Sequence, residues 1–214
     1  MIENPPVQLF AQYPEYLNLK HPLDAMASGD IWITTLSLVM AANCTDKMVN
    51  KVLPKFLTVF PTWKQALGKT RDDLVPLMPG ISHSGNKAEY ILLFAQYLET
   101  HEGKLPATVA ELTELKGFGR KTAGILLHVI SGNDEAIPLD IHALRIMDRL
   151  DWFKATKNPL VREKQLLPLI PEGKRFNTFT VLTQHGRQVC HSRNPECNRC
   201  KFQPACGYYK TITA

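Results

Sequence analysis

Residues 111–126 read Glu-Leu-Thr-Glu-Leu-Lys-Gly-Phe-Gly-Arg-Lys-Thr-Ala-Gly-Ile-Leu, and this stretch decides how the middle of the chain folds. Apolar residues recur at helical spacing on both sides of a short turn, which predicts helices over 108–115 and 120–131. Gly117 and Gly119 permit a left-handed backbone and the close approach of a ligand. The stretch therefore predicts two short helices that pack together through a tight turn.

The same turn carries an anion-binding pattern. The free N–H groups and the positive dipole end of the second helix attract negative charge at its first residues. This is the helix-hairpin-helix pattern, which contacts DNA phosphates without reading the base sequence. A turn that only joins two helices is the alternative, but the neighbouring cations favour phosphate. The residues predicted to contact DNA here are Lys116, Gly117, Phe118, Gly119 and Arg120.

Helical periodicity extends over most of the chain. It predicts further helices over 31–42, from 46 towards 60, and over 87–101, 141–150, 159–169 and 176–189. Pro54 is expected to kink or shorten the second of these, and the tail from Cys190 is expected to be a loop. No period-2 alternation is long enough to predict a sheet, so the predicted fold class is all-α.

The composition indicates a folded protein and argues against membrane and secreted proteins. The 214 residues are 44% hydrophobic and 21% charged, which is typical of one large folded domain or two small ones. The longest apolar run, 31–42, is too short to cross a bilayer, so no membrane association is expected. The first residues, Met-Ile-Glu-Asn-Pro-Pro, lack a signal-peptide pattern, so we expect a cytoplasmic location, nucleoid-associated in a prokaryote. No extra apolar stripe requires a partner, so we expect a monomer. A net charge of +5 permits a polyanionic partner.

Four of the five cysteines lie close together near the C-terminus, as Cys-x6-Cys-x2-Cys-x5-Cys. Four thiolates can bind either tetrahedral Zn²⁺ or an iron–sulfur cube. Structural zinc sites usually contain two close pairs, and only one pair is close here, so the spacing favours the larger cluster. Arg193, between the first two cysteines, is predicted to contact phosphate, with a solvated surface loop as the alternative. The predicted ligands are Cys190, Cys197, Cys200 and Cys206.

Lys121 and Asp140 are the candidate catalytic pair. Lys121 is the second residue of the second helix of the hairpin, which is about 15 Å long. The segment from 133 to 140 can extend over about 23 Å, so the chain can bring Asp140 back beside Lys121. The amine would be a nucleophile, and the carboxylate could accept its proton and stabilise positive charge. Lys121 as a phosphate contact, and Asp140 as a helix N-cap, are the alternatives.

Taken together, the hairpin from 115 to 123, the Asp140 segment and the four cysteines resemble the endonuclease III family of DNA glycosylases. The resemblance covers about residues 30–207. It implies two all-α domains with a DNA cleft between them. A six-helix barrel with the hairpin would span 25–135, and a domain that holds a [4Fe–4S] cluster would combine 1–24 with 136–214.

The resemblance also implies an activity. The lysine marks the bifunctional branch of the family, in which it attacks C1′ of a damaged nucleoside and displaces the base. The resulting Schiff base then undergoes β-elimination, which cuts the strand. Lys121 would be this nucleophile, and Asp140 would activate it. The implied substrate is double-stranded DNA with a damaged base, an oxidised pyrimidine above all, or an abasic site.

Two positions depart from the family pattern. The family usually has glutamine in an Ala-Gln-x-Thr-Asp segment, where it fills the gap left by the flipped base. This chain has Asn43 there, one methylene shorter. In the loop that wedges the opposite strand, His83 replaces the usual bulky apolar residue. Ordinary loop residues are the alternative at both positions.

Two other functions stay open at this point. One is a monofunctional glycosylase for uracil, mismatched or alkylated bases, in which Lys121 only binds phosphate. The other is a non-catalytic, damage-sensing DNA-binding module.

Overall fold

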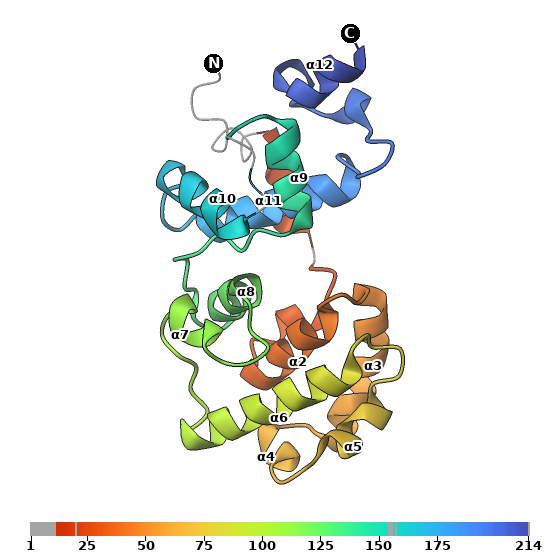
Figure 1. Ribbon diagram of the computed structural model, residues 1–214, viewed down its shortest axis with the longest axis vertical. Coiled ribbons are helices and arrows are strands. Elements are labelled where there is room, and N and C mark those ends of the chain that lie inside the picture. Colours follow the sequence, from red (N-terminus) through yellow and green to blue (C-terminus); the bar gives the residue numbers. More distant parts are fainter. Residues whose placement is uncertain (1–11, 20, 154–155, 157, 214) are drawn as a thin grey trace. The chain divides into compact units, whose positions relative to one another are not determined.

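The computed structural model describes residues 12–19, 21–153, 156 and 158–213 (Figure 1). Within these ranges every regular element is a helix, and no strand occurs. The predicted all-α class is confirmed. In the same ranges, no helix combines the length and the apolar character that a bilayer crossing requires.

The chain divides into two compact units. Lys20–Asn133 forms one, which we call the hairpin unit, and Met1–Leu19 with Asp134–Ala214 forms the other, the cysteine unit. That the first is a six-helix barrel and the second an iron–sulfur domain stays a prediction.

Helix α2 forms the centre of the hairpin unit. It is apolar on nearly every face and packs against α3, α6 and α8. Asp30 begins it by accepting a hydrogen bond from the Ile33 N–H at 2.8 Å, which satisfies one of the free donors of the first turn. The helices of this unit are α2 (Ile31–Ala41), α3 (Asp46–Val59), α4 (Trp63–Ala66), α5 (Arg71–Leu74), α6 (Ser84–Thr100), α7 (Val109–Thr113) and α8 (Arg120–Ser131).

In the cysteine unit, α9 and α11 form the core. Gly186 on α11 lets the two helices approach closely, because a Cβ at this position would lie 2.7 Å from the Cβ of His142. Asp134 accepts hydrogen bonds from the backbone N–H groups of Arg175 and Phe176, at the start of α11. The helices are α9 (Ile141–Arg149), α10 (Pro159–Leu166), α11 (Arg175–Gln188) and α12 (Gly207–Thr213).

Helix α3 runs towards residue 60 as predicted. It continues past Pro54 to Val59, so the proline does not shorten it. Its buried face, Val49, Val52, Leu53 and Phe56, spans the proline, and tertiary packing of this face outweighs the local cost of the proline. The tail after Cys190 is also not entirely loop, because it ends in helix α12.

Candidate functional site

The hairpin joins α7 to α8 through residues 114–119. Thr108 and Glu111 form a capping box that begins α7. Gly117 has a φ of +94°, and a Cβ there would lie 2.4 Å from the Tyr90 ring. Only glycine fits this position, so the turn can approach α6 closely. Gly119 then caps α8, and the first N–H groups of that helix have no partner within it.

The predicted DNA-binding residues of the hairpin differ in their surroundings. The Phe118 side chain is buried against Phe94, with ring centroids 5.1 Å apart, so its aromatic ring serves packing. Lys116 is exposed but forms an ion pair with Glu89 at 2.5 Å, which raises the pKa of Lys116 above its usual value. This ion pair offsets part of the positive charge at the turn. Arg120 is half-buried at the first position of α8.

Lys121 is the exposed cation at the second position of α8. Within the described part of the chain, its ammonium has no hydrogen-bond or ion-pair partner. An amine in this state is accessible to an external electrophile once it is deprotonated.

Asn43 and His83 lie on two loops of the hairpin unit that the structure brings together. Both have left-handed backbone, with φ of 52° and 53°, and both side chains are exposed. The Ser82 hydroxyl donates to the Asn43 carbonyl oxygen at 2.6 Å. The two positions that depart from the family pattern are therefore neighbours in space.

Asp140 begins helix α9 in the cysteine unit. Its Oδ1 accepts hydrogen bonds from the N–H groups of His142 and Ala143, both at 2.9 Å. The N-cap interpretation is thus correct. Asp140 is only 8% exposed, yet its Oδ2 accepts no hydrogen bond from any described residue. Asp140 and Lys121 belong to different units, so their predicted closeness stays a prediction.

His142 is held neutral beside Asp140. Burial lowers the pKa of His142, although the Asp140 charge opposes this shift. The Arg145 guanidinium donates to His142 Nδ1 at 3.1 Å, so this nitrogen carries the lone pair.

All four C-terminal cysteines line one cavity of the cysteine unit. The rest of its lining includes the apolar side chains of Val189 and Pro195 and the rings of Tyr208 and Tyr209. In the described ranges, no three His, Cys, Asp or Glu side chains are grouped so as to share a single metal ion. The chemistry of the set, four thiols that line one cavity, fits a group with four thiolate corners.

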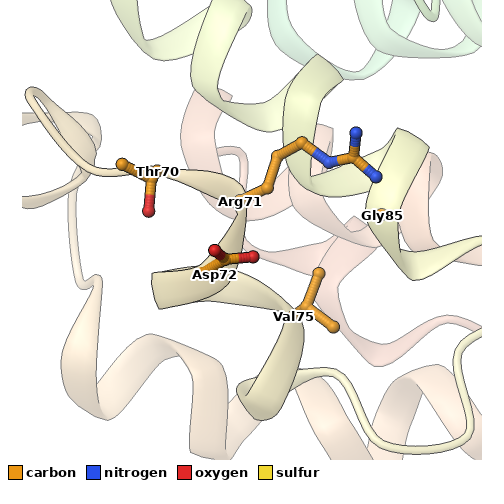
Figure 2. Close-up of a pocket in the computed structure, with 5 residues that line it drawn as sticks. All are labelled: Thr70, Arg71, Asp72, Val75 and Gly85. Atoms are coloured by element: carbon orange, nitrogen blue, oxygen red, sulfur yellow. The ribbon is translucent and has the colours of Figure 1, made fainter.

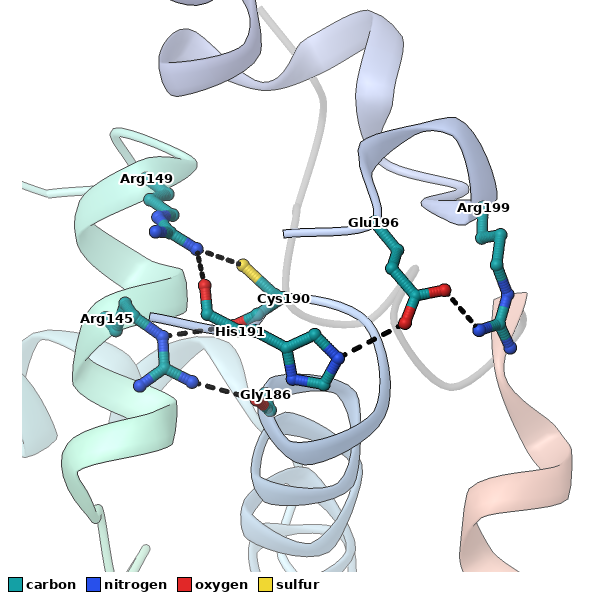
Figure 3. A network of polar contacts seen from close by, with 7 residues as sticks. All are labelled: Arg145, Arg149, Gly186, Cys190, His191, Glu196 and Arg199. Atoms are coloured by element: carbon teal, nitrogen blue, oxygen red, sulfur yellow. Dashed lines mark hydrogen bonds and ion pairs between the residues drawn. The ribbon is translucent and has the colours of Figure 1, made fainter. Parts of the chain in front are cut away.

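Two arginines attach α9 to the first cysteine (Figure 3). Arg145 donates to the Cys190 carbonyl oxygen at 3.0 Å and to the Gly186 carbonyl oxygen at 2.8 Å. Arg149 donates to Cys190 Sγ at 3.2 Å and to the His191 carbonyl oxygen at 2.6 Å. An N–H donor at the sulfur stabilises negative charge on it.

The loop after Cys190 is closed by a second ion-pair network. Glu196 contacts His191 at 3.3 Å and Arg199 at 2.5 Å, as Figure 3 shows. These contacts lower the pKa of Glu196 below its usual value. Arg193 lies on the same loop with its side chain exposed, and no described acidic residue pairs with it.

The sequence did not identify four residues whose side chains hold the loops of the candidate site in place, namely Ser82, Lys87, Arg145 and Arg149. Lys87 carried a usable signal, because it lies one helical turn before Ile91 on the apolar stripe of α6. The two arginines carried none, because their partners lie some 40 residues further along the chain.

An open hollow in the hairpin unit is lined by Thr70, Arg71, Asp72, Val75 and Gly85 (Figure 2). The Arg71 guanidinium lies against Gly85, and a Cβ there would be 2.4 Å from Nη2. No predicted site residue lines this hollow, so it adds nothing to the candidate site.

Comparisons with known proteins agree with this geometry. Residues 36–172 match the family model described as HhH-GPD superfamily base excision DNA repair protein. Endonuclease III of Haemophilus influenzae is 30% identical over 193 residues, 90% of this chain and 90% of the relative. Endonuclease III of a Synechocystis species is 31% identical and covers 80% of this chain and 78% of the relative.

A solved structure extends the likeness to the fold. The trapped covalent intermediate of an endonuclease III with DNA, an estranged-adenine complex, superposes with a TM-score of 0.85 at 26% identity. The match covers 100% of this chain and 97% of that one. Together, these matches show that this chain belongs to the HhH-GPD superfamily of base excision DNA repair proteins and, within it, to the endonuclease III family.

Proposed function

We propose that this protein is a bifunctional DNA glycosylase and abasic-site lyase of base excision repair that acts on damaged bases in duplex DNA. The observation that carries the proposal is the exposed Lys121 amine at the start of α8, in a helix-hairpin-helix turn of an endonuclease III family member. Oxidised pyrimidines are the proposed substrate class. The base must leave the duplex stack before an amine can reach C1′.

In this mechanism Lys121 Nζ forms a bond to C1′, the glycosidic C–N bond breaks, and the base departs. The carboxylate of Asp140 accepts a proton from the attacking amine and stabilises positive charge on the sugar. The C1′–O4′ bond of this amine adduct then breaks and O4′ takes up a proton, which opens the sugar ring and leaves an iminium between C1′ and Nζ. The iminium loses a proton from C2′, and the C3′–O bond breaks, with the 3′ phosphate as the leaving group. Water then releases Lys121.

The N–H groups at the start of α8, with Lys116, Gly119 and Arg120, are the proposed phosphate contacts. Arg193 is a further one, from the cysteine unit. Because these contacts release counterions, DNA binding is expected to weaken as salt rises.

The lesion class is tested on four duplexes that carry an oxidised pyrimidine, a uracil, an alkylated base or a mismatch. We expect base release coupled to strand cutting on the first. Base release without strand cutting would assign the chain to the monofunctional alternative. Tight binding without base release on all four would instead indicate a damage sensor.

We also propose that Cys190, Cys197, Cys200 and Cys206 hold a [4Fe–4S] cluster. Their spacing and their common cavity support this assignment. The cluster would supply a cross-link between four points of the C-terminal loop rather than a step of base removal. The Arg149 N–H groups would offset its negative charge.

Replacing Cys197 with serine is expected to lower folding yield, iron content and DNA affinity together, because one corner of the cross-link is lost. Cys44→Ser is the matched control, since Cys44 belongs to the other unit and should leave iron content unchanged. Iron analysis, yield and duplex binding are measured on both variants. A fully active Cys197→Ser protein without iron would contradict the structural role.

A further inference from the structure

Lys87 is a buried cation that the proposed mechanism does not use. It is 4% exposed and lies in the first turn of α6, on the apolar face of that helix. Burial lowers the pKa of its ammonium, and no described carboxylate forms an ion pair with it. A buried charge of this kind persists only where its donors are satisfied.

The Lys87 ammonium donates three hydrogen bonds, to the end of α2 and to the loop before α6. They reach the Met40 carbonyl oxygen at 2.9 Å, the Ala42 carbonyl oxygen at 2.6 Å and Ser82 Oγ at 3.3 Å. Two of these acceptors are at the C-terminal end of α2, where unpaired carbonyls and the negative dipole end favour a cation. All three donors of the ammonium are thereby used.

Ser82 joins the loop that contains His83 to the loop that contains Asn43. It accepts from Lys87 and donates to the Asn43 carbonyl oxygen at 2.6 Å. Lys87 therefore holds Ala42, the residue before Asn43. It also holds Ser82, the residue before His83, and Ser82 in turn holds the backbone of Asn43. Asn43 and His83, the exposed residues of the two loops, have left-handed backbone. This conformation costs free energy and persists only where the surroundings impose it.

We propose that Lys87 and Ser82 lock the Asn43 and His83 loops into one rigid two-pronged element that engages an opened base pair. In this element Asn43 enters the space left by the extruded base, and His83 stacks against the opposite strand. Lys87 and Ser82 are positioning residues, because Lys87 is buried and the Ser82 hydroxyl is used in the link between the loops. The inference rests on the proposed glycosylase function and adds that the two prongs act as a unit.

Ser82→Ala is the first test, because it removes the link between the loops and leaves Lys87 bound to two carbonyls. We expect kcat for base excision from duplex DNA to fall about five- to tenfold, the contribution of one hydrogen bond. KM should change little, because the hairpin still binds phosphate. Borohydride trapping on an abasic site should stay within about twofold of wild type, since no base has to be extruded. Ser28→Ala, which removes a hydroxyl bonded to Ala25 in the same unit, is the matched control.

A double-mutant cycle tests whether the prongs act together. Asn43→Gly and His83→Gly remove each side chain while glycine keeps the left-handed backbone. In the wild-type background, the two losses in excision rate should be non-additive, and in the Ser82→Ala background they should become additive. Lys87→Met, measured beside its thermal stability, should reduce excision more than Ser82→Ala does.

Additive losses in the wild-type background, or excision by Ser82→Ala at the wild-type rate, would overturn the proposal. So would an equal loss of excision and of abasic-site trapping, because that pattern indicates general damage to the fold. Failure of the glycosylase function itself gives a different result, since the wild-type protein would then neither excise a base nor form an adduct.

Discussion

Replacing Lys121 with glutamine is expected to abolish the covalent adduct that the wild-type protein forms with abasic-site DNA under borohydride. Glutamine keeps a polar side chain, one bond shorter than that of lysine, but has no nucleophilic amine. The amine must form the bond to C1′ before an iminium exists to be reduced. Strand cutting should therefore fall at least about a thousandfold, as it does when a covalent nucleophile is lost. Gel analysis of the adduct and single-turnover cutting measure the two effects.

Lys116→Gln is the matched control, because it changes the same residue type in the same hairpin. Lys116 is already paired with Glu89, so its loss should weaken duplex binding and still allow the adduct to form at saturating protein. An adduct of undiminished yield in the Lys121→Gln protein would remove Lys121 as the nucleophile. No adduct with folded, iron-containing wild-type protein would instead favour a monofunctional glycosylase.

The sequence predicted a helix well where clear residues mark its ends. Helix α8 has the predicted bounds, from Gly119 to the left-handed Gly132 at its end, because glycines mark both ends. Thr45 caps α3 by accepting a hydrogen bond from the Met48 N–H. The short helices α4 and α5 were missed because they have only four residues each, too few to show periodicity.

The candidate site could be predicted by residue type but not by contact. The hairpin spacing indicated a phosphate site, yet it could not show that Glu89, 27 residues earlier, pairs with Lys116. Nor could it show that Phe118, between two glycines, is buried against Phe94. Such contacts depend on how α6 packs against the turn, which is tertiary information.

The same limit applies to the loops that contain Asn43 and His83. Comparison with the family pattern identified both positions, but 40 residues separate them in sequence. Their connection through Ser82 and Lys87 follows from the packing of α2 against α6. A lysine on the apolar stripe of α6 was the only local sign that a buried polar contact had to exist.

Replacing Asp140 with asparagine is expected to reduce base excision by about 10² to 10⁴, the usual effect of removing a general acid–base group. The asparagine Oδ1 can still accept from the His142 and Ala143 N–H groups, so the cap of α9 is preserved. Aspartate and asparagine are nearly equal as N-caps, and stability should change by less than about 1 kcal/mol. Thermal unfolding and single-turnover excision separate the two effects.

Asp30→Asn provides the matched comparison, because Asp30 caps α2 in the same way, through the Ile33 N–H. Both substitutions remove a charge at a helix start, where a negative charge is favourable, and should cost similar stability. Only the Asp140 variant should lose excision, since only Asp140 is proposed to receive the proton of the attacking amine. Equal activity of the two variants would leave Asp140 a helix cap alone, and the proton would then need another acceptor.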